Sequence, residues 1–349
     1  MILIIGAGLS GLLAAYRLKK EGIPFKILEA RNRLGGRIHT LSGKNEAPVE
    51  MGATWFQEHH QNVKTLLKEL NLSSFEQKMD DVVFFQQQKH APVQLLQIPK
   101  QAPSYRISGG TSQLIATLYQ SLNAKEVLLN QTVKQIIFKE NSVQVIAHEI
   151  FEGSHVVLAI PPKLWAKNIS FEPLLPKPLT TVAAQTHTWM EDSIKIALTY
   201  TTPFWQEEKI PGTFFSNSGP ITEFYDHCDH KRSKFALCGF INSSYKNFSE
   251  EARKLEVLSQ LKTVFGEKVE EFLDYKECIW SKEEFTFENS DSTLYPHQNN
   301  GNPIFRESLF ENRLFISSSE SAVESPGYME GAIFSANATA NEIIFTLKI

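Results

Sequence analysis

Three glycines near the start of the chain have the spacing of a phosphate-binding turn. Gly6, Gly8 and Gly11 form the pattern G-x-G-x-x-G, and Glu29 follows about 20 residues further on. The first glycine permits a tight bend, the second lets the backbone approach a pyrophosphate, and the third lets a helix pack closely on a strand. The helix N-terminus offers free N–H groups to the phosphates, and the carboxylate of Glu29 accepts hydrogen bonds from a ribose. The pattern predicts a dinucleotide site.

The segments around these glycines have the order that such a site requires. Residues 1–5 are a short apolar run, which is typical of a buried parallel strand. Residues 9–18 have helical apolar spacing, and residues 24–28 form a second apolar run that ends at Glu29. Because strand, turn, helix, strand and acid follow in this order, a dinucleotide site is favoured over an ordinary strand–helix turn.

A second glycine-rich stretch favours FAD over NAD. Residues 29–37 read E-A-R-N-R-L-G-G-R, with three arginines around two adjacent glycines. The guanidinium groups of Arg31 and Arg37, beside a backbone of this kind, suit a diphosphate. A basic surface loop is the alternative interpretation of the same residues.

Further motifs recur in a fixed order along the chain. Residues 50–55 read E-M-G-A-T-W, residues 156–162 read V-V-L-A-I-P-P, residues 203–205 read P-F-W, and residues 326–332 read P-G-Y-M-E-G-A. Together with residues 29–37, these motifs resemble those of the flavin-containing amine oxidases, which include monoamine, polyamine and L-amino-acid oxidases. The resemblance covers nearly the whole chain.

The resemblance implies an FAD cofactor, and it implies which positions contact that cofactor. These positions are Gly6, Gly8, Gly11, Glu29, Arg31, Arg37, Gly52, Ala53, Thr54, Trp55, Val133, Glu320 and Met329. Glu320 matches an acid that bonds the ribityl or diphosphate region, although Ser319 replaces the usual glycine before it. The family's flavin-linking cysteine has no counterpart at Asn289 or Ser290, so we expect non-covalent FAD.

Lys195 is the main catalytic candidate. Residues 193–200, S-I-K-I-A-L-T-Y, alternate with the period of a strand, so Lys195 points away from the face that carries Ile194 and Ile196. The resemblance implies that Lys195 holds a water against flavin N5, where its charge stabilises the reduced ring. A solvated lysine on an edge strand is the alternative.

Tyr328 is the second catalytic candidate. It matches one of two aromatic rings that flank the substrate amine in the family, and Met329 matches the backbone at the pyrimidine edge of the flavin. The second ring has no counterpart, because residues 287–290 read F-E-N-S. Phe287 and Tyr295 are the residues that we consider for its place.

The distribution of the motifs predicts an α/β (α+β) fold with a discontinuous first domain. We expect a Rossmann-like FAD-binding lobe from residues 1–75, 105–165 and 303–349. A smaller mixed-sheet substrate lobe is expected from residues 76–104 and 166–302. The segment between Trp55 and Gly109 is shorter than in monoamine oxidases, which carry a helical insertion there. The resemblance therefore implies a shorter or more open substrate funnel.

Local patterns predict the elements of both lobes. Alternating runs at residues 133–139, 142–147 and 194–200 predict strands. Helical spacing of apolar residues predicts helices over residues 63–70 and 252–261, the second one closed by Gly266.

Composition limits the class of protein. A chain of 349 residues exceeds a single core and suggests two lobes, and a net charge of −4 gives no electrostatic case for nucleic acid. Three cysteines without paired spacing indicate neither disulfides nor a metal site. No apolar run reaches the ~18 residues of a membrane span, and a first strand at residue 2 leaves no room for a signal peptide. We therefore expect a cytoplasmic protein without a membrane anchor.

The sequence thus predicts an FAD-dependent oxidoreductase of the amine oxidase type. It would oxidise a small-molecule amine by hydride transfer to flavin N5, with reoxidation by oxygen. One alternative is an FAD-dependent dehydrogenase or desaturase that acts on a non-amine substrate. The other is a flavin-binding protein without catalytic activity.

Overall fold

The apolar run at the start of the chain is the middle strand of a five-stranded parallel sheet. The computed structural model describes residues 1–89, 91–288 and 294–348. In order across the sheet, the strands are β10 (Val127–Leu128), β2 (Phe25–Leu28), β1 (Ile2–Ile5), β14 (His155–Leu158) and β21 (Leu314–Ile316). All residues of β1 are buried, because helices and a second sheet cover its two faces. This burial accounts for the uninterrupted apolar sequence of β1.

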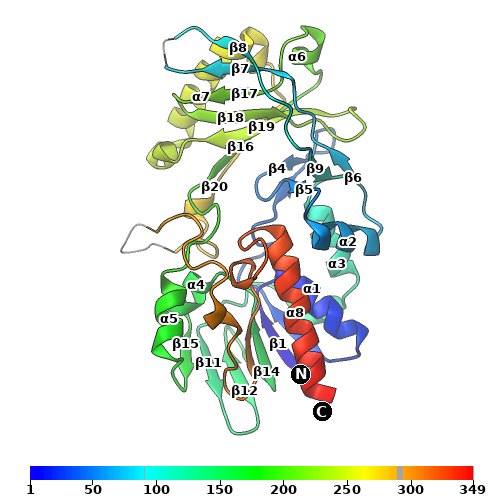
Figure 1. The fold of residues 1–349 in the computed structure, drawn as a ribbon, viewed down its shortest axis with the longest axis vertical. Helices are drawn as coiled ribbons and strands as arrows, with labels where there is room; N and C mark the ends of the chain where they lie inside the picture. The colour runs from blue at the N-terminus through cyan, green and yellow to red at the C-terminus, as the bar shows by residue number, and fades with distance from the viewer. Residues whose placement is uncertain (90, 289–293, 349) are drawn as a thin grey trace.

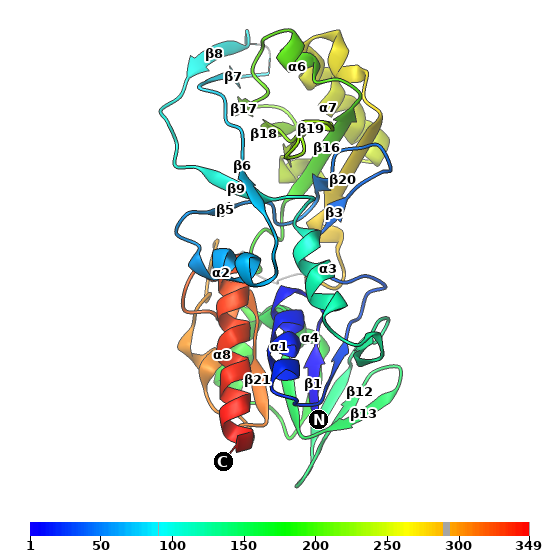
Figure 2. The ribbon, with the colours of Figure 1, turned by 90° about the vertical axis from the view of Figure 1, so that its right-hand side faces the viewer.

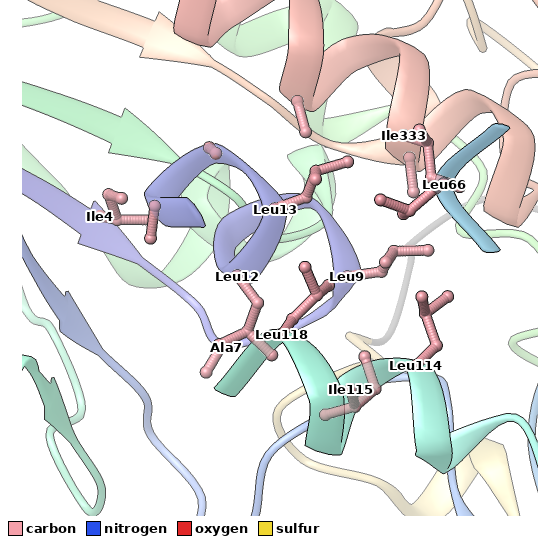
Figure 3. Packing of buried hydrophobic residues seen from close by; sticks show 14 of the residues in the cluster. Ile4, Ala7, Leu9, Leu12, Leu13, Leu66, Leu114, Ile115, Leu118 and Ile333 are labelled. Atoms are coloured by element: carbon pink, nitrogen blue, oxygen red, sulfur yellow. The ribbon is translucent and has the colours of Figure 1, made fainter. Parts of the chain in front are cut away.

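Four helices pack on one face of this sheet (Figure 2). They are α1 (Leu9–Lys20), α2 (Gln61–Glu69), α3 (Ser112–Gln120) and α8 (Met329–Lys348). Figure 3 shows Leu12 of α1 beside Leu118 of α3, and Leu13 pointing toward Ile333 of α8. The two ends of the chain therefore share one core.

The other face of the parallel sheet carries a second, four-stranded sheet and two helices. The strands are β13 (Ile150–Gly153), β12 (Val143–Ile146), β11 (Gln135–Phe138) and β15 (Ser170–Glu172), and the helices are α4 (Pro162–Asn168) and α5 (Lys177–Ala184). β15 pairs with β11, and Phe171 and Leu179 are buried in the same cluster as Leu3 of β1. Residues 170–184 thus pack in the first lobe, whereas the sequence analysis assigned them to the second. Their amphipathic pattern indicates a buried face but not the surface that covers it.

The second lobe is built on a mixed sheet of seven strands (Figure 1). In order they are β20 (Asp274–Ile279), β16 (Ile194–Tyr200), β19 (Phe235–Ile241), β18 (Ile221–Asp226), β17 (Phe214–Ser216), β7 (Val82–Gln86) and β8 (Gln94–Gln97). Helix α7 (Glu250–Phe265) packs on one face and ends at Gly266, which has a φ of 79°. The short helix α6 (Phe204–Glu207) follows β16. Every helix and strand that the local sequence patterns predict in the two lobes is present in the structure.

Smaller elements connect the lobes. They are the pair β3 (Thr40–Leu41) and β4 (Val49–Glu50), and the sheet of β5 (Phe56–Gln57), β9 (Ser104–Ile107) and β6 (Ser74–Glu76). Short 3₁₀ helices lie at Ala124–Glu126, Ser243–Asn247, Glu267–Glu270, Trp280–Lys282, Pro303–Arg306 and Ser319–Ser321. Within the described ranges, no helix is both long and apolar enough to cross a membrane.

Candidate functional site

A cavity of about 770 Å³ is lined by residues of both lobes. The residues predicted to contact FAD that line it are Gly6, Gly8, Glu29, Arg31, Arg37, Gly52, Ala53, Thr54, Trp55, Val133 and Met329. Lys195 and Tyr328 also line this cavity. Gly11 and Glu320 do not. Tertiary folding thus brings together positions from the two ends and the middle of the chain.

The turn from β1 to α1 presents a bare helix N-terminus to the cavity. A Cβ on Gly6, whose φ is +104°, would lie 2.6 Å from Ile160 Cγ2, and one on Gly11 would lie 2.0 Å from the Gly6 oxygen. A Cβ on Gly8, by contrast, would meet only Gly36 Cα, at 4.0 Å. The N-cap of α1 has no side-chain hydrogen bond, and its first turn has no acid. Because the first N–H groups of a helix lack intrahelical partners, this end suits a phosphate.

Glu29 holds the glycine-rich turn in place. Its Oε2 accepts a hydrogen bond from the Ala7 amide at 2.7 Å, and its Oε1 accepts one from the Arg31 amide at 2.9 Å. The side chain is buried but lines the cavity. Each carboxylate oxygen can accept a second hydrogen bond, so the same side chain can also bind ribose hydroxyls. Sequence reasoning identified the residue but missed this structural role.

Glu320 is paired with Arg37 and does not reach the cavity. Arg37 Nη1 and Nη2 lie 2.6 and 3.0 Å from the two carboxylate oxygens of Glu320, and Nη2 also donates to Ser319 Oγ at 2.8 Å. Complete burial raises the pKa of Glu320, but the charge and hydrogen bonds of Arg37 outweigh burial, and the net pKa is lowered. The structure therefore gives Glu320 a role in orienting Arg37, which does line the cavity.

Arg31 connects the first lobe to the segment after β20. Its guanidinium donates to Thr286 Oγ1 at 2.6 Å and to the Phe285 oxygen at 3.1 Å, and it lies 3.3 Å from a Glu283 oxygen. Phe285 and Thr286 also line the cavity. Arg31 therefore holds one wall of the cavity, in addition to carrying positive charge there.

Lys195 lies in the interior of the seven-stranded sheet. Its strand, β16, pairs with β19 on one side and β20 on the other, and the side chain is 2% exposed. The Nζ atom donates to Thr54 Oγ1 at 2.8 Å and lies 4.9 Å from the Trp55 ring and 4.5 Å from the Phe240 ring. Lys195 is therefore not a solvated residue on an edge strand.

Burial lowers the pKa of Lys195 from its usual value, and the neighbouring Cys238, Glu50 and Glu223 act in the opposite direction. An ammonium in such a site interacts strongly with any charge that develops beside it, because little water is present to screen it. The chemistry available at this end of the cavity is stabilisation of negative charge and placement of a water molecule.

Two aromatic rings pack against each other, tilted by 44°, in the wall of the cavity. The Tyr328 ring lies 5.4 Å from the Trp189 ring, and Trp189 stacks on His297 at 4.0 Å. Both Tyr328 and Trp189 line the cavity. A Cβ on Gly327 would lie 2.8 Å from Trp189 Cβ, so a glycine is needed for this approach. Sequence reasoning missed Trp189, because no periodic pattern marks the segment before β16.

The residues considered for the second ring lie elsewhere. Phe287 contacts Lys163, whose Nζ is 5.3 Å from the ring centre, and Tyr295 is 77% exposed. Neither of them lines the cavity. Asn289 and Ser290 lie outside the described residues. In this chain the aromatic neighbour of Tyr328 in the cavity is Trp189.

Comparison with known proteins places this chain among flavoenzymes. A family model described as flavin containing amine oxidoreductase matches residues 9–106 and 87–344. A putative flavin-containing monoamine oxidase, AofH, of Mycobacterium tuberculosis is 28% identical over 253 residues, which cover 71% of this chain and 54% of that protein. The match therefore spans about half the length of this relative. Human amine oxidase [flavin-containing] B is 22% identical over 454 residues, covering 99% of this chain and 86% of the human protein.

Solved structures share the fold over nearly the whole chain. A putrescine oxidase bound to putrescine has a TM-score of 0.83 at 23% identity, covering 99% of this chain and 98% of that one. A cyclohexylamine oxidase of Brevibacterium oxydans IH-35A has a TM-score of 0.85 at 18% identity, covering 100% and 99%. The alignment with the human protein is longer than the 349 residues of this chain, so that relative carries insertions that this chain lacks.

Proposed function

Because the chain belongs to the family of flavin containing amine oxidoreductases, we propose that it holds FAD non-covalently between its lobes and oxidises an amine to an imine, with oxygen as the electron acceptor. One observation carries the proposal. The buried ammonium of Lys195 lies in the same cavity as the bare N-terminus of α1 and the aromatic pair of Trp189 and Tyr328.

The lining of the cavity fits FAD along its length. The N-terminus of α1 and Arg37 offer positive charge to the diphosphate, and Glu29 offers its carboxylate to the ribose. By the family resemblance, Val133 would contact the adenine, and the backbone of Met329, at the start of α8, would contact the flavin ring; both residues line the cavity. FAD, when bound, accepts a hydride from the carbon next to the substrate nitrogen.

The residues of the chain supply position and charge. Tyr328 and Trp189, whose ring centres lie 5.4 Å apart, would form one aromatic wall against which the substrate packs, and this wall would restrict its orientation before reaction. Lys195 would hold a water molecule and stabilise the negative charge that the cofactor gains on reduction. Thr54 fixes the Lys195 ammonium through its hydroxyl.

The relatives support an amine as the substrate. Their printed names include monoamine, putrescine and cyclohexylamine oxidases. In the two named amines, putrescine and cyclohexylamine, the nitrogen is attached to a carbon that carries hydrogen. This bond arrangement is the one that hydride removal requires. The non-amine dehydrogenase and the non-catalytic protein remain the alternatives for the test.

The experiment is a panel of amines, amino acids and polyamines with the purified yellow protein. We expect bleaching of the flavin absorbance without oxygen, and steady release of hydrogen peroxide with oxygen. Bleaching without peroxide release would instead identify a dehydrogenase with another electron acceptor. No bleaching with any amine of the panel would contradict amine oxidation.

A further inference from the structure

A tight turn carries Trp189 into the wall of the cavity. The amide of Glu191 donates to the Thr188 oxygen at 3.1 Å, which closes the turn. Trp189 and Met190 occupy its two middle positions and line the cavity, and Met190 has a φ of 65°. A positive φ at the third residue of a turn is usually taken by glycine, because a side chain makes this conformation costly. The turn therefore keeps its shape only where its surroundings hold it.

A buried ion pair anchors the end of this turn to the first lobe. Lys163 Nζ lies 2.7 Å from Glu191 Oε2, and the two side chains are 1% and 8% exposed. Lys163 is the second residue of α4, and the nearby Pro161 and Leu164 line the cavity. A short, shielded ion pair holds its two groups more strictly than an exposed one, because little water screens their attraction. The pair therefore ties the position of the turn to that of α4.

The contacts of Trp189 itself hold the turn less firmly. Its backbone oxygen accepts a hydrogen bond from Arg37 Nη1 at 3.4 Å, which is longer than most bonds of this kind. Arg37 also binds Glu320 at 2.6 Å, so the position of Arg37 does not depend on Trp189. The Trp189 ring stacks on His297 at 4.0 Å, a contact that fixes the plane of the ring but not the backbone that carries it. Of these contacts, the ion pair two residues away is the firmest.

Stability alone does not explain why an ion pair is buried here. Taking two charges out of water costs free energy, and their mutual attraction repays this cost only in part. Replacing such a pair by uncharged residues of similar size therefore often leaves stability unchanged. A buried pair can instead select one conformation of the chain over others. The conformation at stake in this chain is the left-handed turn at Met190, which sets where the Trp189 ring lies.

We propose that Lys163 and Glu191 are positioning residues that fix Trp189 against Tyr328 in the cavity wall. The inference rests on the proposed amine oxidation, because it assigns the orientation of the substrate wall to this ion pair. Lys163 and Glu191 do not line the cavity themselves, so they act through Trp189. Without the pair, the turn exchanges between conformations, and the aromatic wall orients the substrate for only part of the time.

The test replaces both partners together, as Lys163→Met with Glu191→Gln, so that no unpaired charge stays buried. We expect the Tm of this double variant to stay close to that of the wild type. Its kcat/KM for benzylamine should fall by ~10- to 100-fold, since a small misplacement of an orienting group can cost ~100-fold. Trp189→Ala should show a loss of similar size. Because the pair acts through Trp189, all three substitutions together should lose less than about twofold beyond Trp189→Ala.

Hydrogen exchange gives a second readout that needs no turnover. The amides of Glu191 and Ser193 donate to oxygens within the turn, at 3.1 Å in both cases. Amides of this kind exchange when the turn opens locally, so their exchange rate reports how firmly the turn is held. We expect the peptide of residues 186–193 to exchange at least ~10-fold faster in the double variant than in the wild type.

Glu277→Gln is the matched control. It breaks the buried ion pair of Glu277 with Arg253, which lies on the α7 face of the seven-stranded sheet. This variant should change neither the kcat/KM for benzylamine nor the exchange of residues 186–193. Equal losses in the control and in the double variant would overturn the inference, because they would reflect general destabilisation.

Other results would also overturn the inference. A loss that adds fully to that of Trp189→Ala would show that the ion pair acts on the cavity by another route. Unchanged exchange of residues 186–193, or faster exchange with unchanged kcat/KM, would show that the pair does not fix the wall. In these cases amine oxidation itself would stand. If neither benzylamine nor any other amine bleaches the flavin, the proposed function fails, and the exchange of residues 186–193 decides the inference.

Discussion

Replacing Lys195 by methionine tests whether its buried ammonium serves reoxidation of the cofactor. Lys195 Nζ is hydrogen-bonded to Thr54 at 2.8 Å and is 2% exposed. Loss of one preorganised charge or donor in such a site costs about 10²- to 10³-fold in rate. We expect Lys195→Met to slow reoxidation by oxygen to this extent. Substrate reduction should change less than tenfold, because it depends on the orientation that Tyr328 and Trp189 provide.

Rapid mixing separates the two half-reactions. Reduced Lys195→Met mixed with oxygenated buffer reports reoxidation, and anaerobic mixing with substrate reports reduction. Thr54→Val, which removes the hydroxyl that accepts from Lys195 but keeps the shape, should show a smaller effect of the same sign. Unchanged reoxidation in Lys195→Met would refute the assignment and would favour a dehydrogenase with another acceptor.

The stability of the same variant checks the electrostatic argument. Burial lowers the folded-state pKa of Lys195, so keeping this side chain protonated costs free energy of folding. This cost decreases as the pH rises from the lowered pKa toward the ordinary pKa of lysine. Lys195→Met has no such penalty. We therefore expect its Tm to equal or exceed that of the wild type at neutral pH, with the difference shrinking as the pH rises. Thermal unfolding at several pH values measures this.

Three further predictions concern the cofactor and the ion pair of Arg37. Glu29→Ala should weaken FAD binding by about 1.5–3 kcal/mol and should also lower the Tm of the apoprotein, since the Ala7 and Arg31 amides lose their acceptor; unchanged FAD affinity in a titration would remove Glu29 from the ribose. Glu320→Gln should lower stability by about 1.5 kcal/mol, the lower end of the range for a hydrogen bond to a charged group, because Arg37 is 25% exposed. Since the pKa of Glu320 is lowered, the wild-type advantage in denaturant unfolding should persist above the ordinary glutamate pKa and vanish as the pH falls through the lowered value. Acid or heat should release intact FAD into the supernatant, and flavin retained in the precipitate would show a covalent bond.

The parts of the site that could be predicted from the sequence are those whose residue types are required by local backbone geometry. Gly6 adopts a positive φ, Gly11 leaves no room for a Cβ, and Glu29 binds the amide of Ala7 in the same unit. All of these lie within one strand–turn–helix–strand segment, where each requirement acts on a residue type at a fixed spacing. The alternation around Lys195 likewise identified the face that it occupies, although not that β16 is an interior strand.

The chain's own sequence therefore determined the family, the fold class and the phosphate-binding turn. Tertiary structure alone decided the partners of the remaining side chains. Trp189 meets Tyr328 because loops from distant segments converge, and Glu320 meets Arg37 across the first lobe. Glu223 enters the cavity through a bulge and a strand order that side-chain periodicity does not encode. Periodicity reports which face of an element is buried, whereas the partner of that face follows only from the packing of the whole chain.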